Sequence, residues 1–359
     1  MKKKPTQPQI AVFLLLLAGV FGVWLFTLQP DLLLYWLFGL GFGFILQRFW
    51  ICFVSAASDP IIMGSTERFR AILIGILVAS CGVTVIKYLS DGSLYMLGVS
   101  AVSLPLMIGA FLFGLGMILA GCCSSGMFVR MAEGYTVHII TLICIIIGYL
   151  VANSHYQALW APFVARAPLI FFPEKCGWVG GVGIHIAIIL LFYLASRKYE
   201  QRATSSDNTI YLKGAILLAL LNIVHVLVLK NVWSVTGAFF WFGELINGLL
   251  GSSGTLFAQE NAYTVAVAPN LRNIGLFVGA LASVLLSAKF TVKKIRSKKQ
   301  IGKSIAGGLL MGYGACLAGG CNISAFFMGA ASLSLSAWVF MIFLFAGAFV
   351  GVKILYRML

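Results

Sequence analysis

Two glycine-punctuated apolar segments of the chain end in cysteine and repeat one another 198 residues apart. The first reads GAFLFGLGMILAGCC at residues 109–123, and the second reads GGLLMGYGACLAGGC at residues 307–321. Eight of the fifteen aligned positions are identical. Paired glycine-interrupted segments in two halves of a membrane protein point to a transport site. Because the segments deliver the thiols of Cys123 and Cys321, we expect a cargo that thiols can bind.

A third segment, LQRFWICFVSAASDP at residues 46–60, carries Arg48 and Cys52 inside an apolar stretch. On a continuous helix the two side chains would lie about one turn apart. An arginine within a membrane segment is expensive and by default indicates a functional site. The alternative is that Arg48 extends to the membrane interface while Cys52 packs. We expect both residues to line one substrate path together with the repeated thiols.

Thiols along a membrane path favour a soft anionic cargo. A neutral thiol is a weak donor and a polarisable acceptor, and passage requires binding that is weak and distributed over several sites. Thiolates also suit Cu(I) or Zn, but the sequence has no CxxC and its four histidines are scattered singly. We therefore expect a sulfur-bearing anion, with no resident metal and no cofactor.

Glycine and small polar residues flank the repeated cysteines. Gly121 allows close backbone approach, and Gly319 and Gly320 open space in the second copy. A helix that begins within the membrane offers free N–H groups and partial positive charge to an anion. Candidate caps for such helices are Ser124 and Ser125 in the first copy and Asn322 or Ser324 in the second. We expect Asn322 to belong to the path as well.

Three residues near the first copy distinguish it from the second. Arg130 and Glu133 are spaced i, i+3 and are expected to form a salt bridge that fixes the loop. Cys122 stands where the second copy has Gly320. We expect this fourth thiol to line or narrow the path.

The composition places these segments in a membrane. The 359-residue chain is 61% hydrophobic and 10% charged, and its mean hydropathy is +1.01, whereas soluble domains carry about 25% charged residues. Regular apolar spans lie near 10–28, 70–88, 136–152, 179–196, 210–229, 273–289 and 336–355. Less regular, glycine-rich stretches lie at 32–54, 94–126, 233–262 and 304–334. Irregular backbone at membrane depth needs protein or a cavity to cover it, so these four predict short or re-entrant helices around a central path.

The pattern predicts an all-α polytopic membrane protein with about nine to ten transmembrane helices plus short re-entrant helices, forming one transport domain over residues 1–359. Two pseudo-symmetric repeats are expected at 32–152 and 233–355, joined by connecting helices at 179–229. The span 10–28 is expected to be an additional, retained N-terminal helix rather than a cleaved signal. Whether the repeats are parallel or inverted stays open at this stage.

The charge distribution predicts the orientation in the membrane. The net charge of +15 is concentrated at residues 2–4, 197–213 and 289–303, between apolar spans. Short basic loops mark the cytoplasmic side, so the N-terminus is expected in the cytoplasm and the loop 153–178 outside. This arrangement argues for a lipid bilayer as partner and against nucleic acid. The sequence also shows no nucleophile–base pair, phosphate loop or cofactor motif, so we do not expect an enzyme.

The three cysteine segments resemble the YeeE/YedE family of bacterial inner-membrane proteins, over most of residues 37–355. The family's Q-R-x-x-x-C pattern is matched by Gln47, Arg48 and Cys52. Its two glycine–cysteine blocks, the first followed by R-x-x-E-G, are matched by Leu119 to Cys123 with Arg130, Glu133 and Gly134, and by Gly312, Gly314 and Ala318 to Cys321.

The resemblance implies uptake of thiosulfate or a related sulfur compound across the bacterial inner membrane. It also implies an hourglass-shaped path on which Cys52, Cys123 and Cys321 relay the anion through S–H···S contacts. The chain departs from the family at Cys122, at Ser58 and in its additional N-terminal span, and residues 322–338 look closer to the selenium-linked YedE branch.

Three alternatives therefore remain. They are a selenium-compound transporter, a membrane thiol-redox protein or sulfur-delivery partner of a cytoplasmic sulfurtransferase, and a structural membrane protein.

Overall fold

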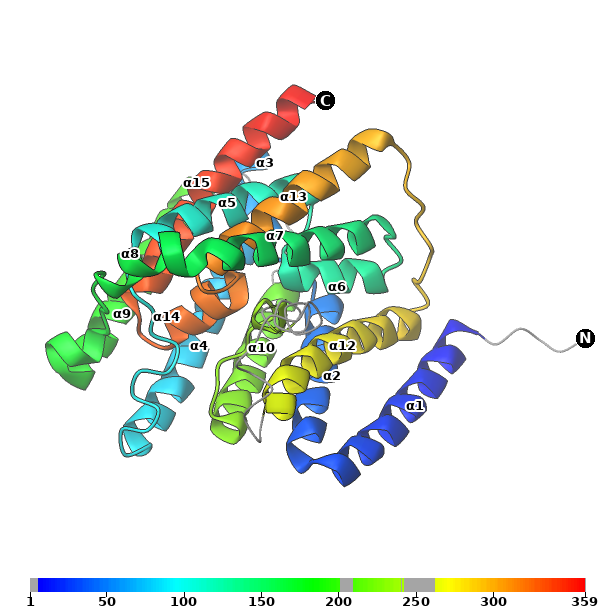
Figure 1. Cartoon of the computed structure of the whole chain (residues 1–359), viewed down its shortest axis with the longest axis horizontal. Coiled ribbons are helices and arrows are strands. Elements are labelled where there is room, and N and C mark those ends of the chain that lie inside the picture. The colour runs from blue at the N-terminus through cyan, green and yellow to red at the C-terminus, as the bar shows by residue number, and fades with distance from the viewer. Residues whose placement is uncertain (1–5, 201–208, 240, 242–261, 359) are drawn as a thin grey trace, which may run out of the picture.

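The computed structural model describes residues 6–200, 209–239, 241 and 262–358 as a bundle of helices (Figure 1). Within those residues nine helices are long and apolar enough to cross a membrane, or ten if a bent pair counts as one span. The helices are α1 (Gln7–Leu28), α2 (Pro30–Arg48), α3 (Phe53–Ile62), α4 (Glu67–Leu89), α5 (Leu104–Ala120), α6 (Ser124–Ala132), α7 (Val137–Leu159), α8 (Ala161–Ala165), α9 (Phe172–Tyr199), α10 (Thr209–Leu229), α12 (Ala262–Leu286), α13 (Lys298–Leu317), the π-helix η1 (Asn322–Met328), α14 (Gly329–Ala331) and α15 (Leu335–Met358).

The prediction of an all-α polytopic membrane protein is confirmed. Each regular span expected from the sequence coincides with one long helix, including 10–28 with α1. The stretch 94–126 begins with a loop before α5, and most of 233–262 lies outside the described residues. The stretches 32–54 and 304–334 each contain a helix break.

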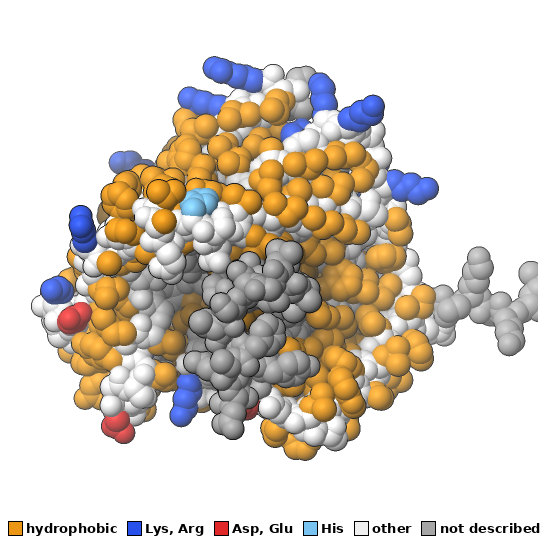
Figure 2. All heavy atoms as spheres, in the orientation of Figure 1, with side chains coloured by type: hydrophobic (Ala, Val, Ile, Leu, Met, Phe, Trp, Pro, Cys, Tyr) orange, Lys and Arg blue, Asp and Glu red, His pale blue; other side chains and the backbone are white. Residues whose placement is uncertain are grey.

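Apolar side chains cover the outside of the bundle. Figure 2 shows hydrophobic side chains across one face, with Lys and Arg mainly around its margin. Large aliphatic side chains such as Val20 and Val179 are 68% and 90% exposed. An exposed apolar surface of this extent is what a helix bundle presents to lipid.

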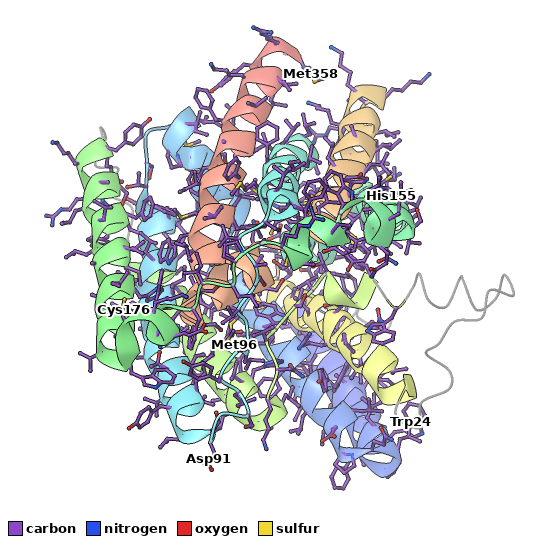
Figure 3. The ribbon with its side chains drawn as sticks, turned by 60° about the vertical axis from the view of Figure 1, so that its left-hand side comes forward. Trp24, Asp91, Met96, His155, Cys176 and Met358 are labelled. Atoms are coloured by element: carbon purple, nitrogen blue, oxygen red, sulfur yellow. The ribbon has the colours of Figure 1, made fainter. Side chains whose placement is uncertain are left out.

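The basic segments lie at one end of the bundle. The Gln7 side chain exchanges two 3.0 Å hydrogen bonds with the backbone of Phe290, which joins the start of α1 to the basic loop before α13. The carboxylate of Glu200, at the start of the other basic loop, pairs with Arg70 near the beginning of α4. In Figure 3, Asp91 beyond the far end of α4 and Met358 lie at opposite ends. The end of α15 therefore lies on the same side as the start of α1, the loop before α13 and Glu200.

The two copies of the repeated segment lie in α5 and α13, which cross in antiparallel directions. A Cβ added to Gly109 would lie 2.6 Å from the carbonyl oxygen of Gly314, and one added to Gly116 would lie 2.6 Å from that of Gly307. Small residues allow membrane helices to approach this closely. The contacts are reciprocal, because Gly109 aligns with Gly307 and Gly116 aligns with Gly314.

Candidate functional site

Each of the three predicted path cysteines lies at a helix break, in the N-cap position of a short helix. Cys52 precedes α3, Cys123 precedes α6 and Cys321 precedes η1. All three have extended backbone, with φ/ψ of −135°/111°, −95°/−179° and −114°/−173° respectively. The first N–H groups of a helix have no partner within it. Each thiol therefore lies beside the N–H groups of the first turn of its helix.

The sulfur of Cys123 itself caps α6. Its Sγ accepts a hydrogen bond from the Gly126 N–H at 3.3 Å and contacts the Ser125 Oγ at 3.5 Å. The prediction that Ser124 or Ser125 forms the cap is wrong, because both are already in the first helical turn and are buried. The capping thiol is held in one orientation by its own helix.

At the second copy, Ser324 completes a reciprocal cap around Cys321. The Cys321 N–H donates to the Ser324 Oγ at 3.0 Å, and the Ser324 hydroxyl lies 3.7 Å from the Cys321 Sγ. Ser324 therefore takes part in the cap, as predicted. Asn322 does not, since its Nδ2 donates to the Met117 Sδ at 3.5 Å. Its Oδ1 is buried without a hydrogen-bond partner among the described residues.

Arg48 and Cys52 do not share a helix, which corrects the one-turn spacing expected from sequence. α2 ends at Arg48, and Trp50 takes a positive φ of 55° before α3 begins. The exposed Arg48 side chain donates from Nη1 to the Ser287 Oγ at 2.6 Å, beyond the end of α12. Cys52 is half-buried and packs against the main hydrophobic core. The break separates the guanidinium from the thiol.

The structure brings the three cysteines together. Cys123 lies within electrostatic range of both Cys52 and Cys321. Two arginines lie near this group, since Arg130 interacts with Cys52 and Cys122, and Arg272 interacts with Cys321. We call these three cysteines the thiol line.

Two glycines in left-handed conformation open space beside the thiol line. Gly121 has a φ of 71° and Gly319 has a φ of 67°, and no atom lies within 4 Å of a Cβ placed on either. Gly319, which aligns with Gly121, opens space as expected from the sequence. The predicted Gly320 is more crowded, because its Cβ would lie 2.5 Å from the Ser324 Oγ. Gly319 also forms part of the wall of a cavity of about 380 Å³ that Ser103 and Tyr156 help to line.

Cys122 forms a buried thiol–imidazole contact. Its Sγ lies 3.3 Å from the Nδ1 of His138, which is 3.5 Å from the Thr141 Oγ1. His138 has no sequence signal of its own, because a lone histidine on an apolar helix carries no spacing pattern. Cys122 is also within electrostatic range of Cys52 and Cys123.

Arg130 and Glu133 form the predicted ion pair at 3.1 Å. The Arg130 guanidinium also lies 5.4 Å from the centre of the Tyr135 ring, and the Lys293 Nζ lies 3.9 Å from the same ring. The backbone N–H of Lys293 donates to the carbonyl of Gly134 at 2.7 Å. These contacts join the end of α6 to the basic loop before α13.

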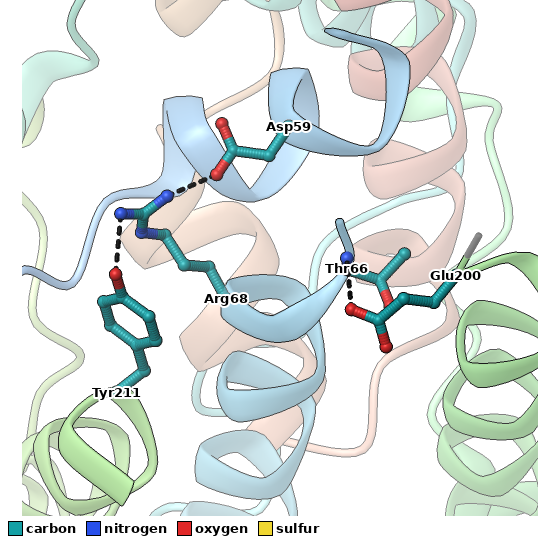
Figure 4. A network of polar contacts seen from close by, with 5 residues as sticks. All are labelled: Asp59, Thr66, Arg68, Glu200 and Tyr211. Carbon is teal, nitrogen blue, oxygen red and sulfur yellow. Dashed lines mark hydrogen bonds and ion pairs between the residues drawn. The ribbon is translucent and has the colours of Figure 1, made fainter. Parts of the chain in front are cut away.

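The end of α3 far from its cysteine is fixed by a polar network (Figure 4). Asp59 pairs with Arg68 of α4, and the Arg68 Nη2 donates to the Tyr211 hydroxyl of α10 at 2.8 Å. Beside them the Thr66 N–H donates to the Glu200 Oε1 at 3.3 Å. The network therefore holds the helix that begins at the first thiol against α4 and α10.

The remaining cysteines lie away from the thiol line. Cys144 is buried where α7 meets α13, and Cys316 packs with Ala152 and Leu317 in a separate apolar cluster. Cys176 is exposed on α9 at the edge of the bundle (Figure 3). All eight cysteines are free thiols. No group of three or more His, Cys, Asp or Glu in the described part of the chain is placed to hold a metal ion.

Long apolar helices interrupted at three thiols define a class of protein, the multi-pass membrane transporter. A family model described as "Sulphur transport" matches residues 50–350. The chain belongs to this family.

Relatives agree with that assignment. The chain is 27% identical over 341 residues to the thiosulfate transporter TsuA of Spirochaeta thermophila, which covers 89% of this chain and 98% of that protein. It is 24% identical to the thiosulfate transporter TsuA of Escherichia coli, over 88% of this chain and 92% of that protein. It is 37% identical to the probable transporter YedE of Escherichia coli, but over only 37% of this chain and 33% of that protein.

Proposed function

We propose that the protein takes up thiosulfate, or a closely related sulfur oxyanion, along the thiol line. The observation that carries this proposal is that Cys321, Cys123 and Cys52 each occupy the N-cap of a short helix at a break within a membrane segment. Two full-length relatives named as thiosulfate transporters support the choice of cargo.

The geometry suits a divalent anion that must bind and then leave. Each N-cap offers a thiol beside the positive end of a helix, which attracts an anion without placing a full charge on the path. Arg130 is paired with Glu133, and Arg272 is bound to His225 and the Ser234 carbonyl, so both guanidiniums near the thiol line have partners of their own. Binding distributed over three neutral thiols stays weak enough for release.

We infer an inward orientation from the charged loops. Both basic loops and the N-terminus lie at one end of the bundle, and short basic loops mark the cytoplasmic side. In a bacterial inner membrane, Arg272 and Cys321 then lie nearer the outside and Arg130 nearer the cytoplasm. The antiparallel crossing of α5 and α13 further supports an inverted arrangement of the two copies.

We propose transport rather than catalysis. Two alternative functions, transport of selenium compounds and delivery of sulfur, can be distinguished from it by experiment. The partial match to YedE favours selenium compounds as the second candidate cargo. Delivery of sulfur to a cytoplasmic sulfurtransferase would instead require a persulfide on one of the clustered thiols.

The deciding experiment is uptake of radiolabelled thiosulfate into proteoliposomes, with and without ion gradients. Unlabelled sulfate, selenite and selenosulfate serve as competitors, and empty liposomes serve as the control. We expect uptake that excess thiosulfate abolishes and sulfate barely affects. Stronger competition by selenite or selenosulfate than by thiosulfate would assign a selenium cargo. A persulfide trapped on Cys52, Cys122, Cys123 or Cys321 without net uptake would favour sulfur delivery.

A further inference from the structure

A buried arginine lies at the outer end of the thiol line, beside a cavity. Arg272, in α12, is only 3% exposed. Its Nη1 lies 2.7 Å from the His225 Nε2, and its Nη2 donates to the carbonyl oxygen of Ser234 at 2.9 Å. Its Nε has no hydrogen-bond partner among the described residues. The guanidinium therefore keeps an unfilled donor.

The charge of Arg272 has no counter-ion among the residues that the structure describes. Three ion pairs form there, and each of them uses a different arginine. The centre of the Tyr35 ring lies 5.4 Å from the guanidinium carbon. His225 is a hydrogen-bond partner of the guanidinium but carries no negative charge. A buried cation without an acid is costly within a membrane, and an anionic ligand would offset that cost.

The cavity next to Arg272 has about 400 Å³ of space. Its polar lining includes the hydroxyl of Tyr35, which accepts a 2.5 Å hydrogen bond from the Asn231 side chain, and the exposed Asp31. The Asn231 Oδ1 has no hydrogen-bond partner among the described residues. The other lining residues are Val232, Ser234, Gly237, Trp241, Ala268 and Pro269. The cavity over Gly319, by contrast, has no charged side chain in its described lining.

Residues 233–235 are fixed to α12 and to α2. The Arg272 side chain binds the Ser234 carbonyl, and the Asn273 Nδ2 donates to the Val235 carbonyl at 2.9 Å. The buried Trp233 stacks on Phe42 of α2 with ring centres 3.7 Å apart. Arg272 lines the cavity and also interacts electrostatically with Cys321. Its positive charge therefore acts on both the cavity and the thiol line.

We propose that this cavity is the outer binding site for the anion, with Arg272 as the residue that selects a divalent oxyanion before it reaches Cys321. The Arg272 guanidinium and the second N–H of the Asn231 Nδ2 would donate to the oxyanion, because charge-assisted hydrogen bonds from guanidinium suit sulfonate-like oxygens. Asp31 is an exposed member of the cavity lining, and its carboxylate repels an anion that comes close to it. This inference rests on the proposed function.

The test is the concentration dependence of thiosulfate uptake by full-length protein in proteoliposomes. We expect Arg272→Gln to raise the half-saturating concentration about 10-fold to 100-fold, the range that loss of hydrogen bonds to a charged group gives. The maximal rate stays near that of the unsubstituted protein, because the thiol line is intact. Arg272→Lys restores part of the affinity, since it keeps the charge but not the planar fork. Arg166→Gln removes an exposed arginine elsewhere and serves as the matched control.

A second variant covers the case in which Arg272→Gln fails to fold. Asn231→Ala removes only an uncharged partner, and we expect it to raise the half-saturating concentration about 3-fold to 10-fold. An unchanged half-saturating concentration in both variants, or a fall in maximal rate alone, would overturn the inference and leave the proposed function standing. Absence of uptake by the unsubstituted protein would instead remove the proposed function.

Discussion

The crossing of α5 and α13 gives a prediction whose size can be estimated from the structure. A Cβ at position 307 would lie 2.6 Å from both the Gly116 carbonyl oxygen and the Ala120 backbone nitrogen. Ordinary contact begins at 3.4 Å, so Gly307→Ala requires the two backbones to separate by about 0.8 Å. Backbone atoms cannot turn aside as a side chain can. The helices α5 and α13, which end shortly before Cys123 and Cys321, must therefore move apart.

We expect Gly307→Ala to lower both stability and uptake. Overpacking of this kind costs about 1–3 kcal/mol, and the gain from replacing glycine by alanine in a helix offsets roughly 0.5–1 kcal/mol. The net loss corresponds to a fall of a few degrees in melting temperature. The assay is thermal unfolding of the purified protein in detergent, followed by tryptophan fluorescence, with uptake measured on the same preparation.

Gly302→Ala is the matched control in the same helix. Nothing lies within 4 Å of a Cβ at Gly302, which is exposed near the start of α13. This change is expected to leave the melting temperature unchanged or to raise it slightly. Equal melting temperatures and equal uptake for the two variants would refute the close crossing of α5 and α13.

Two further predictions concern the helices at the breaks. Cys123→Ala removes the acceptor of the Gly126 N–H and is expected to lower the free energy of unfolding by about 0.5–2 kcal/mol. Cys123→Ser keeps an acceptor, so it should melt normally yet fail to transport. Normal uptake by the serine variant would contradict a role for the thiol. Asp59→Asn should destabilise the protein by about 1.5–3 kcal/mol, because it removes a charge-assisted hydrogen bond to Arg68. Tyr211→Phe removes only a hydroxyl that accepts from Arg68 and should destabilise it by less. Equal melting temperatures for the two variants would show that the ion pair contributes little.

The helical class and the importance of the two repeated cysteine segments could be predicted because each has a strong local signal, while a path along the cysteines stays a prediction. Long apolar runs and a low charge fraction mark membrane helices without reference to tertiary contacts. The glycine–cysteine repeat indicated the helix breaks at Cys123 and Cys321, whereas nothing in the sequence indicated the break before Cys52. The structure places Cys52, Cys123 and Cys321 at those breaks and within electrostatic range along one series.

The details of the breaks could not be predicted because tertiary packing decides them. Ser124 and Ser125 were expected to cap α6 since serine is a preferred cap. The helix begins one residue too early for that, because Cys123 is the last extended residue and Ser124 is already helical. The break between Arg48 and Cys52 has neither glycine nor proline, and Trp50 adopts a positive φ that its residue type disfavours. A spacing rule for one continuous helix therefore failed there.

Two other functional candidates lacked a usable sequence signal. Arg272 precedes the apolar span 273–289, so the sequence placed it outside the span, whereas α12 extends from Ala262 to Leu286 and buries it. His138 was set aside as a single histidine, and only the fold brings it to Cys122. Contacts between elements distant in sequence determine both sites.

The most direct test of the account is uptake of radiolabelled thiosulfate by three single variants, Cys52→Ala, Cys123→Ala and Cys321→Ala, reconstituted at equal protein amounts. Cys176→Ala, which removes an exposed thiol on α9, is the matched control. The account predicts that the control transports like the unsubstituted protein, while each of the three falls to the level of empty liposomes. Uptake at the control rate by the Cys123 and Cys321 variants would contradict the thiol line as the substrate path.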